Sequence, residues 1–170
     1  MRRLLEPKPA PGAFAFPGRP GRPGRPGRLL HEVLIERGHA PIVPLPVLAQ
    51  AWRPGQWTPL TRAVPQCVVF GVHASAPPSC GACQAGHTED DAKRAGRLLA
   101  SAAIPTEMRP DAVGALAVVI AARHPQAVIA TSDPRDITAY RDALPGAAEA
   151  IRVLDVRDLA AFLAGKRVLG

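Results

Sequence analysis

The stretch Ala127–Asp136, with the sequence AVIATSDPRD, decides how the rest of the chain is interpreted. Its first five residues, Ala127–Thr131, are apolar or β-branched and predict a short buried strand. A helix is expected directly after it, with Asp133 at the N-cap and Pro134 in the first turn. Ligands of an open parallel sheet bind outside the carboxyl ends of the strands, so this junction is a candidate site. Thr131, Ser132, Asp133 and Asp136 lie where such a fold places its chemistry. Capping of the helix by Asp133 is the alternative explanation.

Helix and strand patterns alternate along the chain on both sides of this stretch. Helices are predicted over residues 29–38, 46–53, 58–64, 88–102, 112–123, 133–144 and 157–164. Strands are predicted within residues 41–44, 67–72, 127–131 and 151–156. Strands that alternate with helices predict an α/β fold, with a mostly parallel sheet between two helical layers. The chain of 170 residues is long enough for one such three-layer α/β/α domain.

The net charge of +7 is concentrated near the N-terminus. Residues 1–28 contain seven Arg or Lys and one Glu, which gives +6 and leaves +1 for residues 29–170. A Pro-Gly-Arg repeat runs from Pro17 to Arg28. We therefore expect a disordered basic arm at 1–28 and a folded domain at 29–170. Spaced arginines attract nucleic acid without reading its sequence, so RNA contact is one role for the arm. A segment that is not native coding sequence is the other explanation.

Residues 73–87, with the sequence HASAPPSCGACQAGH, show no periodicity and are expected to form an irregular insert. They contain the pair Cys80 and Cys83 in a CxxC spacing, with His73, His87 and Cys67 nearby. A structural zinc site needs four ligands, and the sequence offers neither a second CxxC pair nor an H-x₃₋₅-H spacing. Ordinary loop cysteines, a zinc site and a redox role for the CxxC pair all stay open.

The three cysteines are too few for a disulfide scaffold, and no secretory signal follows the first residues. No apolar run approaches the ~18 residues that cross a bilayer. We expect a cytoplasmic protein without a membrane partner.

Two aspartates, Asp111 and Asp133, are placed at predicted helix starts that would meet at the carboxyl-end edge of the sheet. Carboxylates gathered at such an edge suit Mg²⁺ or Mn²⁺, hard cations that bind oxygen ligands. A cation of this kind can activate water for attack on a phosphodiester. The pair therefore predicts a metal-dependent nuclease site.

With these residues the chain resembles the PIN domain, the VapC-like ribonuclease toxins of prokaryotic toxin–antitoxin pairs. The likeness is carried by residues 42–53, by residues 88–99 leading to 111–115, and by residues 128–136. It implies a metal-dependent endoribonuclease that uses Mg²⁺ or Mn²⁺. The implied partners are an RNA substrate, a cognate antitoxin and a second copy of the chain in a homodimer.

The resemblance also implies a role for each site residue. Asp111 and Asp133 would hold the cation, and Asp136 would orient water or the metal. Gln50 would contribute a polar contact. The hydroxyls of Thr131 and Ser132 would lie beside the scissile phosphate.

Three departures from the family pattern imply that activity is impaired. Gln50 stands where the family usually has a glutamate, and Gly114 stands where another aspartate is common. The family also opens with a central strand that ends in Asp, and residues 1–28 contain no such run. The missing first strand, the Pro-Gly-Arg arm and the insert at 73–87 together suggest an altered or misread gene, or a decayed toxin. The alternative function is a catalytically silent PIN-fold module that binds an antitoxin or RNA.

Overall fold

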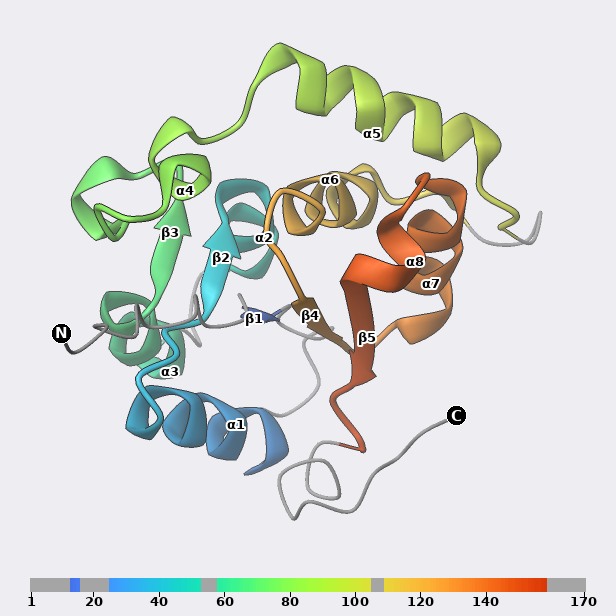
Figure 1. Ribbon diagram of the computed structural model, residues 1–170. Coiled ribbons are helices and arrows are strands. Elements are labelled where there is room, and N and C mark those ends of the chain that lie inside the picture. Colours follow the sequence, from blue (N-terminus) through green and yellow to red (C-terminus); the bar gives the residue numbers. More distant parts are fainter. Residues whose placement is uncertain (1–12, 16–24, 53–57, 105–108, 159–170) are drawn as a thin grey trace, which may run out of the picture.

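The computed structural model shows a mixed α/β fold built on one parallel sheet (Figure 1). It describes residues 13–15, 25–52, 58–104 and 109–158. The five strands lie in the order β3-β2-β1-β4-β5, and every neighbouring pair is parallel. Their bounds are β1 Ala13–Ala15, β2 Ile42–Pro44, β3 Val68–Phe70, β4 Ala127–Thr131 and β5 Ile151–Asp155.

Strand β1 lies in the middle of the sheet, between β2 and β4. Its Phe14 is in register with Ile42 on one side and with Ile129 on the other. The expected disordered arm at 1–28 is thus corrected for residues 13–15 and for residues 25–28, where the first helix begins. A three-residue strand between prolines and glycines has too short a pattern to stand out, and its pairing partners are distant in sequence. The other residues of the arm, 1–12 and 16–24, lie outside the described part.

Six of the helices follow the predicted order with shifts at their ends, and two short ones, α4 and α8, were not predicted. Their bounds are α1 Arg25–Glu36, α2 Leu45–Ala51, α3 Thr58–Ala63, α4 Gly81–Ala85, α5 Glu89–Ser101, α6 Ala112–Ala121, α7 Pro134–Ala143 and α8 Ala147–Ala150. The insert at 73–87 is less irregular than expected, because it contains α4 and a turn of 3₁₀ helix at His73–Ser75. The helix predicted over 157–164 lies outside the described residues from position 159 onward. Among the helices that are described, none is long and apolar enough to cross a membrane.

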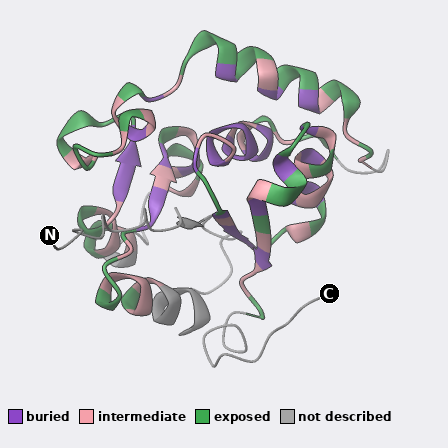
Figure 2. Ribbon diagram, viewed as in Figure 1, coloured by how far each residue is buried: buried purple, intermediate pink, exposed green. Residues whose placement is uncertain are grey.

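The main core lies between one face of the sheet and the helices α5, α6 and α7 (Figures 1 and 2). Helix α6 is the most buried of these, since residues 117–121 are all inaccessible to solvent. Its sequence, AVGALAVVIA, has no polar face, and this fits a helix enclosed on all sides.

The two faces of the sheet alternate along the strands, as the period of two requires. In β4, Ala127 and Ile129 point into the main core. Val128 and Ala130 belong instead to a second cluster on the opposite face, which includes Leu34 of α1. Helices therefore contact both faces of the sheet.

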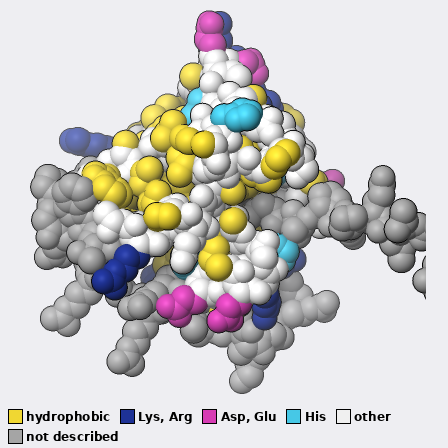
Figure 3. Space-filling model, turned by 90° about the vertical axis from the view of Figure 1, so that its left-hand side faces the viewer, with side chains coloured by type: hydrophobic (Ala, Val, Ile, Leu, Met, Phe, Trp, Pro, Cys, Tyr) yellow, Lys and Arg dark blue, Asp and Glu magenta, His cyan; other side chains and the backbone are white. Residues whose placement is uncertain are grey.

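Strand β3 forms one edge of the sheet. Figure 3 views the molecule from that side and shows many hydrophobic side chains on the surface. Among the large hydrophobic side chains that the structure describes, Leu45 and Val72 are exposed, at 42% and 38%.

Candidate functional site

Two helices that pack together, α6 and α7, each begin with an aspartate at the N-cap. Asp111 caps α6, since its Oδ1 accepts a 2.9 Å hydrogen bond from the backbone N–H of Val113. Asp133 precedes α7 directly after β4, but its side chain makes no capping hydrogen bond with the described residues. Capping therefore accounts for Asp111 Oδ1 and leaves the carboxylate of Asp133 available for another role.

Asp136, in the first turn of α7, lies within the electrostatic influence of both of these aspartates. Burial raises the pKa of Asp136, the negative charges of Asp133 and Asp111 raise it further, and Arg135 opposes them. Its side chain is only 7% exposed, and Oδ1 has no hydrogen-bond partner among the described residues. A buried polar atom without a partner is costly, so this oxygen marks a place for a cation, a water or a proton.

Tyr140 fixes the start of α6 against α7. Its hydroxyl accepts a 2.7 Å hydrogen bond from the backbone N–H of Asp111, and its ring is fully buried. Burial raises the pKa of Tyr140. Gly114, in the first turn of α6, lies close to Asp111, because a Cβ built there would be 3.3 Å from Asp111 Oδ2. Position 114 is thus directed toward Asp111, which together with Asp133 and Asp136 we call the acidic cluster.

The acidic cluster is loose. Within the described ranges, the carboxylate oxygens of its three members do not all lie within 4.8 Å of one another. Strand β1 adds no carboxylate at its end, because Ala15 is followed in the sequence by Phe16. A cation held here would need water molecules to complete its coordination.

Of the remaining predicted site residues, Thr131 is joined to the cluster by a hydrogen bond, whereas no hydrogen bond that the structure describes joins Gln50 or Ser132 to it. Gln50 is exposed near the end of α2. Thr131 is buried, and its hydroxyl accepts a 3.0 Å hydrogen bond from the backbone N–H of Asp133. It therefore shapes the turn between β4 and α7. Ser132 is exposed at the same turn, where a hydroxyl can reach a ligand.

A second cluster lies beyond the other end of α6 and consists of Cys80, Cys83 and His124. The three ligand atoms all lie within 4.8 Å of one another. His124 Nε2 is 3.5 Å from Cys80 Sγ and 3.3 Å from Cys83 Sγ. Burial and the neighbouring Cys80 raise the pKa of the Cys83 thiol to about 12, against a smaller opposing effect of Arg123. Burial lowers the pKa of His124.

His124 was not among the residues predicted from sequence to lie near the CxxC pair. It follows Cys83 by 41 positions, and the two meet because the turn after α6, at Arg123 and His124, contacts the insert. His73, which is closer in sequence, is exposed. His87 packs edge-on against Phe70, with ring centroids 5.1 Å apart, and does not belong to the cluster.

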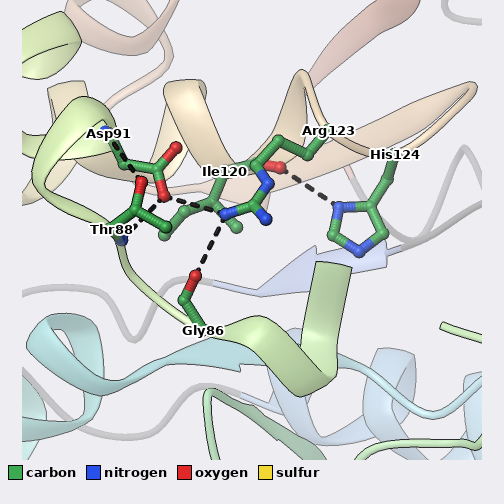
Figure 4. A network of polar contacts seen from close by, with 6 residues as sticks. All are labelled: Gly86, Thr88, Asp91, Ile120, Arg123 and His124. Carbon is green, nitrogen blue, oxygen red and sulfur yellow. Dashed lines mark hydrogen bonds and ion pairs between the residues drawn. The ribbon is translucent and has the colours of Figure 1, made fainter. Parts of the chain in front are cut away.

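A polar network fastens the insert to the end of α6 (Figure 4). Arg123 donates from Nη1 to Asp91 Oδ2 at 2.8 Å and to the carbonyl oxygen of Gly86 at 3.0 Å. Asp91 also forms the predicted capping box of α5 with Thr88, with hydrogen bonds of 3.0 and 3.1 Å. His124 Nδ1 lies 3.1 Å from the carbonyl oxygen of Ile120.

The insert is also held by a close approach of two backbones. Gly71 and Gly86 both have positive φ, of +88° and +71°. A Cβ at position 86 would lie 2.7 Å from the Cα of Gly71, so only glycine fits there. The N–H of Gly71 donates a 3.0 Å hydrogen bond to the carbonyl oxygen of Cys83, which ties the CxxC helix to β3.

Comparison of the chain with models of protein families, with curated proteins and with solved structures gave no match. The likeness to the PIN domain therefore stays a prediction from sequence motifs.

The two candidate sites differ in the ligand atoms that they offer. The acidic cluster at the start of α6 offers only oxygen atoms, and the cluster beyond the end of α6 offers sulfur and nitrogen atoms.

Proposed function

We propose that this chain is a PIN-like endoribonuclease with a three-layer α/β/α fold, which depends on Mg²⁺ or Mn²⁺ and has a weakened site. The supporting observation is the position of Asp136, whose buried and unpartnered Oδ1 lies under the electrostatic influence of Asp111 and Asp133. As the resemblance implies, the RNA substrate and an antitoxin would be its partners.

The arrangement of the sheet supports the PIN-like proposal. The resemblance calls for a first strand in the centre of the sheet, and β1 occupies that position between β2 and β4. It also calls for an aspartate that opens a helix and another that follows a strand, and Asp111 and Asp133 have these positions. The side of α6 that carries residue 114 faces Asp111, as expected of a position that often bears a third carboxylate.

The chemistry of the donor set fits a hard cation, because all three side chains offer carboxylate oxygens. Asp111 Oδ2 and Asp133 would hold the cation, while Asp111 Oδ1 is engaged in capping α6. Asp136 would orient a water molecule through Oδ1. When bound, the metal ion supplies positive charge to the phosphate and lowers the pKa of a coordinated water. The exposed hydroxyl of Ser132 would contact the substrate.

Activity is weakened because the site lacks acids at three positions. The sequence has Phe16 after β1, Gln50 on α2 and Gly114 on α6. Each missing carboxylate removes negative charge that would attract the cation, so water and substrate phosphates must complete its coordination. We therefore expect weak binding of Mg²⁺ and slow cleavage.

Cleavage of RNA by the purified full chain tests this proposal. We expect slow cleavage in Mg²⁺ or Mn²⁺ that EDTA abolishes and that falls by roughly 100-fold or more in Asp133→Ala. Asp142→Ala is the matched control, since Asp142 is an exposed aspartate on the same helix and pairs with Arg141. Its activity should equal that of the unchanged protein.

Two outcomes would overturn the enzymatic proposal. One is the absence of cleavage that depends on the metal, and the other is cleavage that persists unchanged in Asp133→Ala. Binding of RNA or an antitoxin without any cleavage would instead favour the catalytically silent module.

A further inference from the structure

We propose that Cys80, Cys83 and His124 bind one Zn²⁺ ion in a site with three protein ligands and an open fourth position. This site lies apart from the acidic cluster and does not depend on the nuclease proposal. It would join the insert at 73–87 to the end of α6.

The distances between the ligand atoms are those that a tetrahedral zinc ion requires. With Zn–S bonds of about 2.3 Å and Zn–N bonds of about 2.0 to 2.1 Å, sulfur and nitrogen ligands lie about 3.6 Å apart. The observed Sγ–Nε2 distances are 3.5 Å for Cys80 and 3.3 Å for Cys83. All three ligand atoms lie within 4.8 Å of one another, so one ion can contact them together.

The protonation of His124 favours a cation over a pair of ordinary hydrogen bonds. Its Nδ1 lies 3.1 Å from the carbonyl oxygen of Ile120, which can only accept, so Nδ1 carries the proton. Nε2 then has one lone pair, and two sulfur atoms face it. A single lone pair in the plane of the ring cannot accept two well-aligned S–H bonds. A zinc ion placed between the three atoms would be coordinated by both thiolates and by the lone pair of Nε2.

The proposed ligand residues also make hydrogen bonds to surrounding groups of the kind that orient metal ligands in proteins. A zinc-bound histidine usually donates its other N–H to a carbonyl or carboxylate, as Nδ1 does to Ile120. The backbone N–H of Cys83 lies 3.4 Å from Cys80 Sγ and can donate to a thiolate there. The close approach of Gly71 and Gly86 holds the backbone on which the CxxC pair is carried.

The number of ligands indicates the kind of site. Among the described residues, no fourth Cys, His, Asp or Glu belongs to the cluster. Zinc sites with three protein ligands keep a fourth position for water or a small ligand. Cys80 is half-buried, so solvent reaches the cluster on its side. Two cysteines and one histidine are soft to borderline ligands that prefer Zn²⁺ to Mg²⁺ or Ca²⁺.

Binding must displace protons from the two thiols. Zn²⁺ replaces one proton on Cys80 and one on Cys83, and His124 contributes a lone pair without losing a proton. About two protons should therefore be released for each zinc ion bound near neutral pH. A zinc ion bound adventitiously to surface histidines would not release about two protons per ion.

Zinc titration of the reduced, metal-free full chain tests the proposal. We expect one Zn²⁺ per chain, and with Co²⁺ the visible absorption and thiolate charge-transfer bands of a tetrahedral site. Cys80→Ser should weaken binding on the order of 100-fold or more. Cys67→Ser is the matched control, because Cys67 is also half-buried but lies outside the cluster, and it should bind zinc unchanged.

Protection from alkylation gives a readout that does not depend on a variant. In the unchanged protein, Zn²⁺ should slow alkylation of Cys80 at least about tenfold while leaving the rate at Cys67 unchanged. The proposal is overturned if no stoichiometric zinc binds, if Cys80→Ser binds it as well as the unchanged protein while circular dichroism shows it folded, or if zinc protects neither thiol of the CxxC pair.

Discussion

The backbone N–H of Asp111 donates a 2.7 Å hydrogen bond to the hydroxyl of the fully buried Tyr140. This bond ties the first turn of α6 to α7, and so it sets where Asp111 lies relative to Asp133 and Asp136. The acidic cluster therefore depends on a side chain that is not itself an acid.

Tyr140→Phe should remove this bond and leave the rest of the core intact. The N–H of Asp111 would lose its partner in a half-buried position, which costs on the order of 1 to 2 kcal/mol of unfolding free energy. Urea unfolding measures the loss. The same substitution should also reduce the stabilisation that Mg²⁺ gives, and an unchanged response to Mg²⁺ would contradict the positioning role of Tyr140.

Gly114→Asp should strengthen the acidic cluster. A Cβ at position 114 would lie 3.3 Å from Asp111 Oδ2, so a carboxylate there would face the same cation. We expect Mg²⁺ affinity to rise by roughly tenfold, measured by titration calorimetry. Gly114→Ala is the steric control, because it adds the same Cβ, which also approaches Ile137 and Tyr140, without the charge. Equal Mg²⁺ affinity in the two variants would show that position 114 does not face the ion.

Asp91→Ala should destabilise the fold strongly. The carboxylate of Asp91 is 5% exposed, accepts from Arg123 and completes the capping box of α5. Its removal leaves Arg123 without its carboxylate partner, at a cost of roughly 3 kcal/mol in unfolding free energy. Glu89→Ala, which breaks the exposed pair with Lys93 on the same helix, should cost less than about 1 kcal/mol. Similar losses in the two variants would contradict the role of the buried network.

Gly86→Ala should disrupt the insert. A Cβ there would lie 2.7 Å from the Cα of Gly71, and φ is +71°, so the backbone must move at a cost of roughly 3 kcal/mol. Gly146→Ala is a control for the left-handed helical region, with φ +76°, ψ −5° and nothing within 4 Å of the added Cβ, and it should cost about 1 kcal/mol. Gly86 has ψ −157°, a region that essentially only glycine adopts, so its backbone angles contribute to its larger cost together with the close approach. Thermal unfolding compares them. Equal effects would show that the approach of the two backbones is not tight.

The zinc-free protein should lose stability on acidification. Burial lowers the pKa of His87 and of His124 below the ordinary value of 6.5, so the unfolded chain binds these protons more tightly than the folded one. The contribution of these two histidines to the unfolding free energy is then fully present above about pH 6.5. It is lost as the pH decreases from 6.5 toward their lowered pKa values. Unfolding free energies between about pH 5 and 8 measure this slope. Stability that rises on acidification through this range would contradict it.

The parts of the fold that local sequence determines were predicted well. The capping box of Thr88 and Asp91, the strand Ala127–Thr131 and the proline after it lie where their patterns placed them. Each of these signals uses residues that are neighbours in the chain. The electrostatic influence of Asp111 and Asp133 on Asp136 is consistent with the general placement of helix starts at one edge of a parallel sheet.

Features of the structure that depend on contacts between residues far apart in the sequence could not be predicted. Strand β1 exists because Ala13–Ala15 pairs with β2 and β4, which lie about 30 and 115 positions further along the chain. His124 meets the CxxC pair only because the turn after α6 contacts the insert. Neither relation leaves a spacing that can be recognised in the sequence.

The most direct test of the proposed function is to locate Mn²⁺ by anomalous scattering in crystals of the full chain. The proposal predicts a single strong peak beside Asp136 Oδ1, within about 2 to 4.5 Å of carboxylate oxygens of Asp111 and Asp133, so that direct bonds or one intervening water can join them. A saturated crystal without density at that place would contradict the claim that these three aspartates form a metal site.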